Sequence, residues 1–140
     1  MNNLTYGMIK PDAIEKNYTG KIIDIILQNG FKILAIKQLQ LTVSQAEKFY
    51  YVHRNRPFYR ELVEYITRGP VIAMVLEKEN AVQSYRDILG ATDPVEAAEG
   101  TIRKLFGESK AINAIHGSDS DENAQIEISF MFSELEIINN

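Results

Sequence analysis

The chain has 140 residues, 45% of them hydrophobic, and a formal net charge of −4, which fits one globular domain over residues 1–140 and argues against general binding of nucleic-acid backbones. It has no cysteine, which excludes disulfides, thiol catalysis and thiolate metal sites and favours a cytoplasmic location. Neither an apolar run of the about 20 residues that a membrane span requires nor a secretory signal is visible, so we expect no membrane partner.

The first strand is predicted over residues 4–9 and stops at Lys10-Pro11-Asp12, because proline cannot donate to a strand ladder. This places Lys10 at a strand end, either as a solvated lysine beside a turn or as a functional side chain. A helix is predicted over residues 19–28, where isoleucines recur at helical spacing, and a second strand over residues 31–41.

The middle of the chain is predicted to contain three helices and a buried strand. The helices cover residues 44–53, about 58–68, and 80–89, and the near-continuous apolar run at 71–76 is typical of a central strand. Ser44-Gln45-Ala46-Glu47 is a capping-box pattern that opens the first of these helices, Arg56-Pro57 separates it from the second, and Gly90 closes the third.

Residues 91–114 lack a strand pattern. Asp93-Pro94 resembles an N-cap followed by proline at the first helical position, which predicts a short helical turn. A connection of this length inside a small domain is usually functional. It contains Thr92, Thr101, Arg103 and Lys104, whose groups suit phosphate and hydroxyl contacts.

The last strand is predicted over residues 111–115, with His116 at its end and a final helix over residues 121–132. At about 100° per residue, one broad arc of that helix is apolar, and Glu127 falls inside it. The arc comprises Ala124, Ile126, Ile128, Phe130, Met131 and Phe132. A carboxylate on an apolar face needs a partner. Glu127 therefore either pairs with a structural cation near the rim or faces His116 and orients its ring.

The predicted order of elements is β-α-β-α-α-β-α-β-α. Two similar halves around an antiparallel four-stranded sheet would give a ferredoxin-like α+β sandwich with the order βαββαβ and helices packed around it. A doubly wound parallel sheet is the rival, since helices separate most of the strands.

Six segments occur in the order found in one enzyme family, and together they extend over nearly the whole chain. They are Lys10-Pro11-Asp12, Arg56-Pro57-Phe58, Gly69-Pro70-Val71, Gly90-Ala91-Thr92-Asp93-Pro94, Gly100-Thr101-Ile102-Arg103 and Asn113-Ala114-Ile115-His116-Gly117-Ser118-Asp119-Ser120. The last segment is highly specific. In these segments the chain resembles the nucleoside diphosphate kinases.

The resemblance implies a ferredoxin-like fold and a ping-pong reaction. A histidine takes the γ-phosphoryl group of a nucleoside triphosphate, usually ATP, and passes it to a nucleoside diphosphate. The resemblance also implies Mg²⁺ as cofactor, held mainly by the nucleotide phosphates and not by a protein metal site. It further implies a homo-oligomer, for which a hexamer is favoured and a tetramer is the alternative. The segment after Gly90 resembles a family loop that helps to form the nucleotide cleft and subunit contacts.

The site follows from matching the family's motifs position by position. His116 is the expected phosphorylated nucleophile, and Ser118 and Glu127 match the pair that supports its imidazole. Further expected site residues are Tyr50 near the histidine, Lys10, Arg86, Thr92 and Arg103 at the phosphates, Lys10 and Asn113 at the ribose, and Phe58 and Leu62 at the base. Lys104 departs from the small or acidic residue that usually follows the Gly100–Arg103 motif, and no role is assigned to it.

These residue types suit phosphoryl transfer, which depends on placing groups and stabilising charge on the transferring oxygens. Taken singly, Arg86 is also compatible with a surface charge, and Tyr50, Phe58 and Leu62 with packing. Two other functions remain open. One is a nucleotide-binding or regulatory module without turnover, and the other is a phosphatase in which water discharges the same phosphohistidine.

Overall fold

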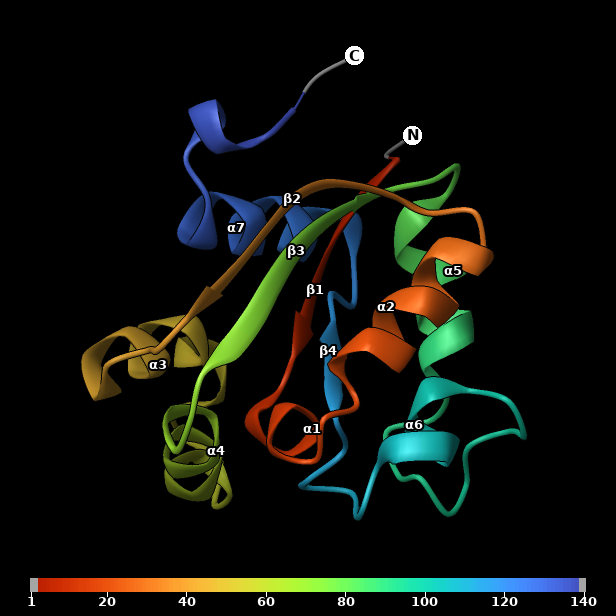
Figure 1. Cartoon of the computed structure of the whole chain (residues 1–140). Coiled ribbons are helices and arrows are strands. Elements are labelled where there is room, and N and C mark those ends of the chain that lie inside the picture. The colour runs from red at the N-terminus through yellow and green to blue at the C-terminus, as the bar shows by residue number, and fades with distance from the viewer. Residues whose placement is uncertain (1–2, 139–140) are drawn as a thin grey trace.

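A four-stranded antiparallel sheet forms the centre of the computed structural model, which describes residues 3–138 (Figure 1). In space the strands follow the order β2-β3-β1-β4. They are β1 (Leu4–Ile9), β2 (Lys32–Leu39), β3 (Val71–Glu77) and β4 (Ile115–Gly117). Every neighbouring pair is antiparallel. The predicted ferredoxin-like α+β fold is confirmed, and the rival parallel sheet is wrong.

Helices pack against the sheet (Figure 1). Within residues 3–138 they are α1 (Pro11–Glu15), α2 (Thr19–Gln28), α3 (Val43–Phe49), α4 (Tyr59–Thr67), α5 (Ala81–Leu89), α6 (Ile102–Phe106) and α7 (Asp121–Met131), with 3₁₀ turns η1 (Tyr51–His53) and η2 (Glu134–Glu136). None of these helices is long and apolar enough to cross a membrane.

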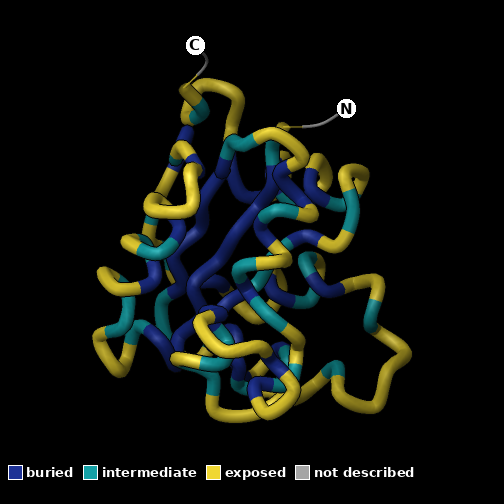
Figure 2. The backbone as a smooth tube through the Cα atoms, turned by 90° about the vertical axis from the view of Figure 1, so that its right-hand side faces the viewer, coloured by how far each residue is buried: buried dark blue, intermediate teal, exposed yellow. Residues whose placement is uncertain are grey.

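The side chains of β3 alternate between two hydrophobic clusters, one on each face of the sheet. Val71, Ala73 and Val75 pack with side chains of α3, α4 and α7, whereas Ile72, Met74 and Leu76 pack with side chains of α2 and α5. A strand buried on both faces reads as a continuous apolar run, which explains why it was recognisable in the sequence. Figure 2 shows the buried strands in the middle of the molecule, with exposed segments around them.

Two helices and a turn differ from prediction. The helices α1 and α6 were not predicted, because five residues are too few to show a helical period. Asp93 does not start a helix: its side chain accepts a hydrogen bond from the Val95 amide, 3.0 Å away, in a turn. An Asp side chain that bonds its own backbone two residues on stabilises a turn instead of a helix.

The helix α3 begins and ends earlier than predicted. Its capping box is formed by Thr42 and Gln45 and not by Ser44 and Glu47. The helix stops at Phe49, and residues 51–53 form the separate turn η1. The cap is therefore displaced by two residues, although the sequence correctly indicated the helix itself.

Candidate active site

His116 occupies the middle of β4, where it pairs with Met8 of β1. The prediction that His116 follows the last strand is therefore wrong: the strand begins only at Ile115. Its ring packs between aromatic neighbours, with the centroid 5.6 Å from that of Phe49 and 5.9 Å from that of Tyr6. Neither aromatic was predicted to belong to the site. Tyr6 could have been found from strand alternation, since it shares a face of β1 with Met8.

One oxygen of Glu127 joins His116 and Ser118. Nε2 of His116 lies 2.9 Å from Oε1 of Glu127, and the Ser118 hydroxyl donates to the same oxygen at 2.7 Å. The His116 and Glu127 side chains are 19% and 18% exposed. Of the two interpretations of Glu127, the structure therefore supports the one in which it faces the ring.

Glu127 lies on the buried face of α7, and this face contains fewer apolar residues than predicted. Its N-cap Ser120 accepts a hydrogen bond from the Asn123 amide, which fixes where the helix begins. Ala124, Ile128 and Met131 are buried, whereas Ile126 and Phe130 are 59% and 41% exposed. Glu127 lies three residues after Ala124 and next to Ile128, so it faces the sheet. Ile126 and Phe130 do not belong to that face.

Lys10 is a buried cation and not a solvated lysine, with 7% of its surface exposed. Its ammonium donates to Oδ1 of Asn113 at 2.9 Å, and its amide donates to the carbonyl of Ala114 at 2.9 Å. Burial, together with the positive charge of Arg103, lowers the pKa of Lys10 to about 7, while Asp12 acts in the opposite direction. Lys10 is thus fixed beside the chain segment that leads into His116.

Arg103 is held by backbone carbonyls on both sides of the site. Its two terminal nitrogens donate to the carbonyls of Gly90 at 3.0 Å and Ile115 at 2.9 Å. Its Nε is buried and has no hydrogen-bond partner within residues 3–138. Burial lowers the pKa of Arg103, and the nearby Arg86 lowers it further. This mutual repulsion of Arg86 and Arg103 marks a locally cationic region in an acidic chain.

A γ-turn precedes the histidine strand. The amide of Ile115 donates to the carbonyl of Asn113 at 2.9 Å, and the intervening Ala114 has a φ of 76°. A positive φ in a residue other than glycine is strained, and such strain costs on the order of 1–3 kcal/mol. The turn shortens the predicted strand and gave no signal in the sequence, because alanine is not a residue that favours this conformation.

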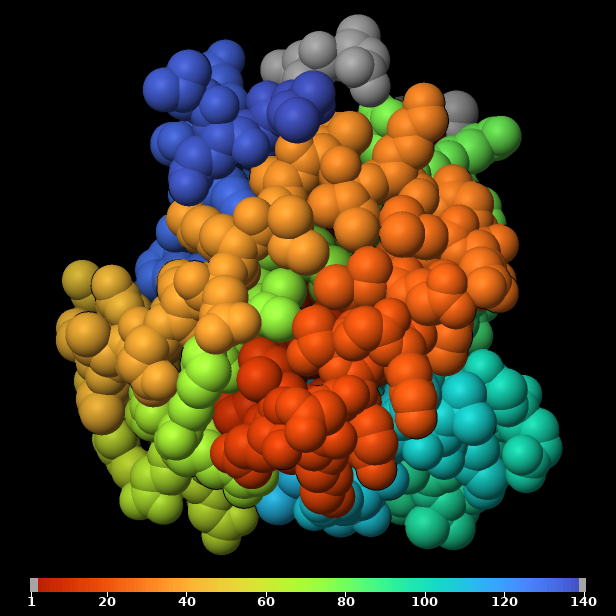
Figure 3. Space-filling view, viewed as in Figure 1, coloured from red at the N-terminus to blue at the C-terminus, as the bar shows by residue number. Residues whose placement is uncertain are grey.

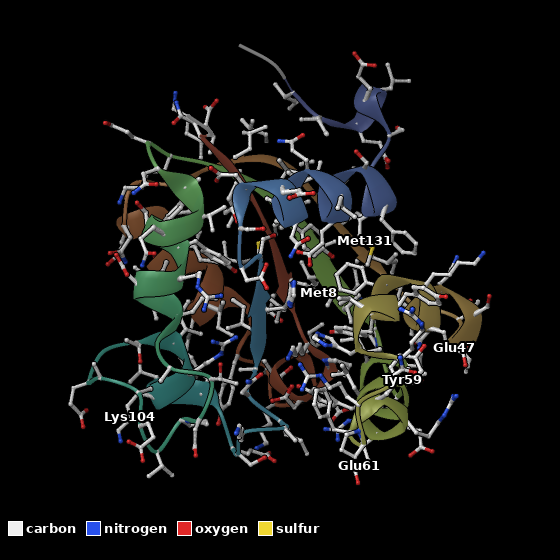
Figure 4. The ribbon with its side chains drawn as sticks, turned by 180° about the vertical axis from the view of Figure 1, so that it is seen from behind. Met8, Glu47, Tyr59, Glu61, Lys104 and Met131 are labelled. Atoms are coloured by element: carbon white, nitrogen blue, oxygen red, sulfur yellow. The ribbon has the colours of Figure 1, made fainter. Side chains whose placement is uncertain are left out.

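The loops before and after α6 meet the site through their backbones. The Asn113 side-chain amide donates to the carbonyls of Thr92 at 3.0 Å and Lys110 at 3.2 Å. The Thr92 side chain itself is exposed. Seen from behind, β4 runs between α3 and α4 on one side and α5 and α6 on the other (Figure 4). Lys104, labelled there, lies on the outer side of α6, and its ammonium is 3.5 Å from the carbonyl of Val95.

The residues predicted to contact the base lie on α4: Phe58 is its N-cap residue and Leu62 is in its first turn. Phe58 is 46% exposed, and its ring centroid lies 5.7 Å from that of His53. Leu62 is half-buried and packs against the hydrophobic cluster below. Tyr50 is buried and connects to the histidine through Phe49, whose ring is 4.9 Å from the Tyr50 ring. Burial and the charge of Glu127 raise the pKa of Tyr50.

Two hollows of about 370 and 320 Å³ lie away from this site. The first is lined by residues of β2, α3 and α7, and the second by residues of β1, α7 and the segment after it; His116, Lys10 and Arg103 line neither. No cluster of three or more His, Cys, Asp or Glu that could hold a metal ion occurs in residues 3–138. The candidate site is therefore defined by its chemistry: an imidazole oriented by a carboxylate, beside cations that suit an anionic ligand.

Comparison with known proteins identifies the family. Residues 3–137 match the family profile described as nucleoside diphosphate kinase. Curated relatives named nucleoside diphosphate kinase include one from Persephonella marina, 54% identical over 134 residues, which span 96% of each chain. Another, from Wolinella succinogenes, is 58% identical over 133 residues, which span 95% of this chain and 97% of the relative. The chain belongs to the nucleoside diphosphate kinase family. The predicted enzyme class, a nucleoside diphosphate kinase acting as a phosphotransferase, is thereby confirmed.

Solved nucleoside diphosphate kinases share the whole fold. The enzyme from Aquifex aeolicus superposes with a TM-score of 0.96 at 52% identity, covering 97% of this chain and 99% of that one. A halophilic nucleoside diphosphate kinase from Halobacterium salinarum, solved in complex with CDP, has a TM-score of 0.94 at 35% identity, covering 99% and 93%.

Proposed function

We propose that this nucleoside diphosphate kinase works by a ping-pong mechanism with a covalent phosphohistidine at His116. The observation that carries the proposal is the pair of hydrogen bonds at Oε1 of Glu127, one to Nε2 of His116 and one from Ser118. A nucleophile with an acid that orients it is the arrangement that covalent catalysis requires. The Halobacterium relative binds CDP, a nucleoside diphosphate, which supports the same class of substrate for this chain.

Nδ1 of His116 is the attacking atom in this mechanism. If Nε2 carries the proton and donates it to Glu127, the lone pair of the ring is on Nδ1. Nδ1 forms a bond to the γ-phosphorus while the bond from that phosphorus to the bridging oxygen breaks, and the nucleoside diphosphate leaves. In the second half-reaction, an oxygen of the β-phosphate of another nucleoside diphosphate attacks the same phosphorus, and the Nδ1–P bond breaks.

The carboxylate of Glu127 stabilises the positive charge that the ring acquires on attack. The charge develops in a region shielded from water, since both side chains are about four-fifths buried. A fixed negative charge stabilises a developing charge more strongly there than in water. Ser118 holds the carboxylate in place by donating to the oxygen that faces the ring.

Lys10, Arg86 and Arg103 are the proposed phosphate contacts, with Thr92 from the neighbouring loop. The Nε of Arg103 supports this role, because it is a buried donor without a hydrogen-bond partner within residues 3–138. Such a donor costs free energy, and a phosphate oxygen would accept its hydrogen bond. Lys10 and Asn113 are the proposed ribose contacts and already touch each other. Phe58 is the proposed stacking surface for the base, with Leu62 on its apolar side, and Tyr50 is the proposed tyrosine near His116. Stacking on a ring tolerates any base, which favours broad nucleotide specificity.

Mg²⁺ is proposed as a cofactor that arrives on the nucleotide. The cations Lys10 and Arg103 do not suit a protein-held divalent ion, and the carboxylate of Glu127 is already engaged by His116 and Ser118. Phosphate oxygens are the ligands that Mg²⁺ prefers, and there it neutralises phosphate charge. A homo-oligomer, hexamer favoured over tetramer, and a cytoplasmic location stay predictions, as does the single domain over residues 1–140. Light scattering would decide the oligomer.

Labelling with γ-³²P-ATP tests the proposal. The protein should take up acid-labile, alkali-stable label, and unlabelled nucleoside diphosphate should discharge it as nucleoside triphosphate. His116→Asn should take up none. Nucleotide binding without labelling would instead favour the regulatory module. Discharge of the label by water as fast as by nucleoside diphosphate would favour the phosphatase.

A further inference from the structure

Tyr65 of α4 contacts the site, although the sequence assigned it no role. It is buried, and its hydroxyl donates to Oδ1 of Asp12 in α1, 53 residues away along the chain. The ammonium of Lys10 lies 5.5 Å from the centroid of the Tyr65 ring, within the range of a cation–π contact. One tyrosine therefore meets both the lysine of the site and a buried acid.

Asp12 carries the negative charge of this group. It is 1% exposed, and a carboxylate so deeply buried requires a hydrogen-bond donor and a neighbouring cation. Tyr65 is the donor. Two cations feel the charge of the acid: Asp12 favours the protonated form of Lys10, which Arg103 of α6 opposes, and it also acts on the guanidinium of Arg68. Asp12 thus offsets part of the cost of burying Lys10 beside Arg103.

The helix α1 is fixed on both sides by ion pairs. At its far end, Glu15 accepts two hydrogen bonds from Arg68, at 2.8 and 3.1 Å, and the Arg68 guanidinium lies 5.4 Å from the Tyr65 ring. On the other side, Lys16 pairs with Glu108. Figure 3 shows α1, in red, between the yellow-green α4 and the teal segment that contains α6. These two ion pairs join exposed side chains. The Tyr65–Asp12 hydrogen bond is buried, and the same Tyr65 ring contacts Lys10, the N-cap residue of α1.

We propose that Asp12 and Tyr65 are positioning residues that hold the ammonium of Lys10 over the Tyr65 ring and against Asn113, in the place where it meets the nucleotide phosphates. The inference rests on the proposed function, since it takes Lys10 to be a phosphate contact. The Tyr65–Asp12 hydrogen bond links α4 to α1. The N-cap residue of α1 is Lys10, a proposed phosphate contact, and the N-cap residue of α4 is Phe58, the proposed base contact. A purely structural role at the junction of α1 and α4 is the alternative.

The charge of Asp12 is tested by Asp12→Asn, which keeps an acceptor for Tyr65 and removes the negative charge. The first readout is the titration of Lys10 in protein labelled with ¹³Cε-lysine, assigned by its loss in Lys10→Met. Asp12 favours the protonated form of Lys10, so the Lys10 signal should titrate at a lower pH in the variant than in the wild type. The alkaline limb of the labelling rate against pH should move in the same direction.

The geometry is tested by Tyr65→Phe, which keeps the ring and removes the hydroxyl. Residues that act through a shared partner are non-additive. Tyr65→Phe should lower kcat/KM about 10-fold in the wild-type background and by less than about 2-fold in the Lys10→Met background. The matched control is Glu15→Gln, which breaks the ion pair with Arg68 at the same junction and should leave both the Lys10 titration and kcat/KM unchanged.

The outcomes separate this inference from the proposed function. The inference is overturned if Asp12→Asn and Tyr65→Phe only lower the melting temperature. In that case the Lys10 titration would not move, and the losses of kcat/KM from Tyr65→Phe and Lys10→Met would be additive. Asp12 and Tyr65 would then be purely structural. If Asp12→Asn does not fold, the Tyr65→Phe cycle decides alone. Should wild-type protein fail to take up label, the proposed function fails, while the titration of Lys10 in Asp12→Asn still tests whether the acid controls the lysine.

Discussion

Nε2 of His116 and Oε1 of Glu127 lie 2.9 Å apart across the contact between β4 and α7. The distance fits a hydrogen bond that fixes both the rotation of the ring and the nitrogen that carries its proton. Because Ser118 donates to the same oxygen, the carboxylate cannot turn away without losing two bonds.

Replacing Glu127 should slow chemistry more than it weakens binding. We expect Glu127→Ala to lower the single-turnover rate of His116 labelling about 10²-fold, because an orienting acid contributes in the transition state. The affinity for ADP, measured by calorimetry, should change little. Glu122→Ala, which removes an exposed acid from the first turn of the same helix, is the control. Equal losses of affinity and labelling rate would mean that Glu127 is only structural.

Lys10 should destabilise the fold at low pH. Its folded pKa of about 7 lies below the unfolded value of 10.5, so the unfolded chain binds more protons between these values. The penalty for burying the charge is complete below about pH 7 and disappears as the pH rises towards 10.5. Lys10→Met should therefore raise the melting temperature at pH 6, by a margin that shrinks at pH 9.

Circular dichroism melts at several pH values would measure this margin. The control is Lys21→Met, at an exposed position of α2, whose melting temperature should follow that of the wild type at both pH values. A margin for Lys10→Met that grows with pH would contradict the pKa assigned to the buried amine.

Glycine at position 7 of β1 should be required by the ring of Tyr85. A Cβ added to Gly7 would lie 2.5 Å from the Tyr85 hydroxyl, and Gly7 pairs with Gly117 beside His116. Gly7→Ala should cost about 1–3 kcal/mol of unfolding free energy, as overpacking does. The buried Tyr85 hydroxyl has no partner within residues 3–138, so Tyr85→Phe should itself be tolerated.

Urea denaturation of the single and double variants checks this account. Gly7→Ala combined with Tyr85→Phe should lose less stability than Gly7→Ala alone, because the nearest clashing atom is absent. Gly20→Ala is the control: nothing lies within 4 Å of an added Cβ in that turn of α2, and the change should stabilise by about 0.5–1 kcal/mol. A Gly7→Ala loss that Tyr85→Phe does not reduce would show that another contact limits the site.

A site residue was easier to predict from the sequence when the residues that position it lie close to it along the chain. Glu127 was recognisable because a helical period is local, and its position on the buried side of α7 was visible in eleven residues of sequence. The burial of Lys10 depends on α4, α6 and the turn at Ala114, which are distant in sequence, so the local pattern left a solvated lysine open. The Tyr65–Asp12 bond spans 53 residues and gave no local signal. The fold class, in contrast, was predictable from the family motifs, whereas the alternation of strands and helices alone left a parallel sheet open.

The ring nitrogen that carries the phosphoryl group tests the central claim most directly. Protein labelled with γ-³²P-ATP would be hydrolysed in alkali, which preserves phosphohistidine, and the two isomers separated by chromatography against standards. The hydrogen bond from Nε2 to Glu127 predicts the Nδ1 isomer, at one phosphoryl group per chain and absent from His116→Asn. Label on Nε2 of His116, or on any other residue, would contradict the proposed mechanism.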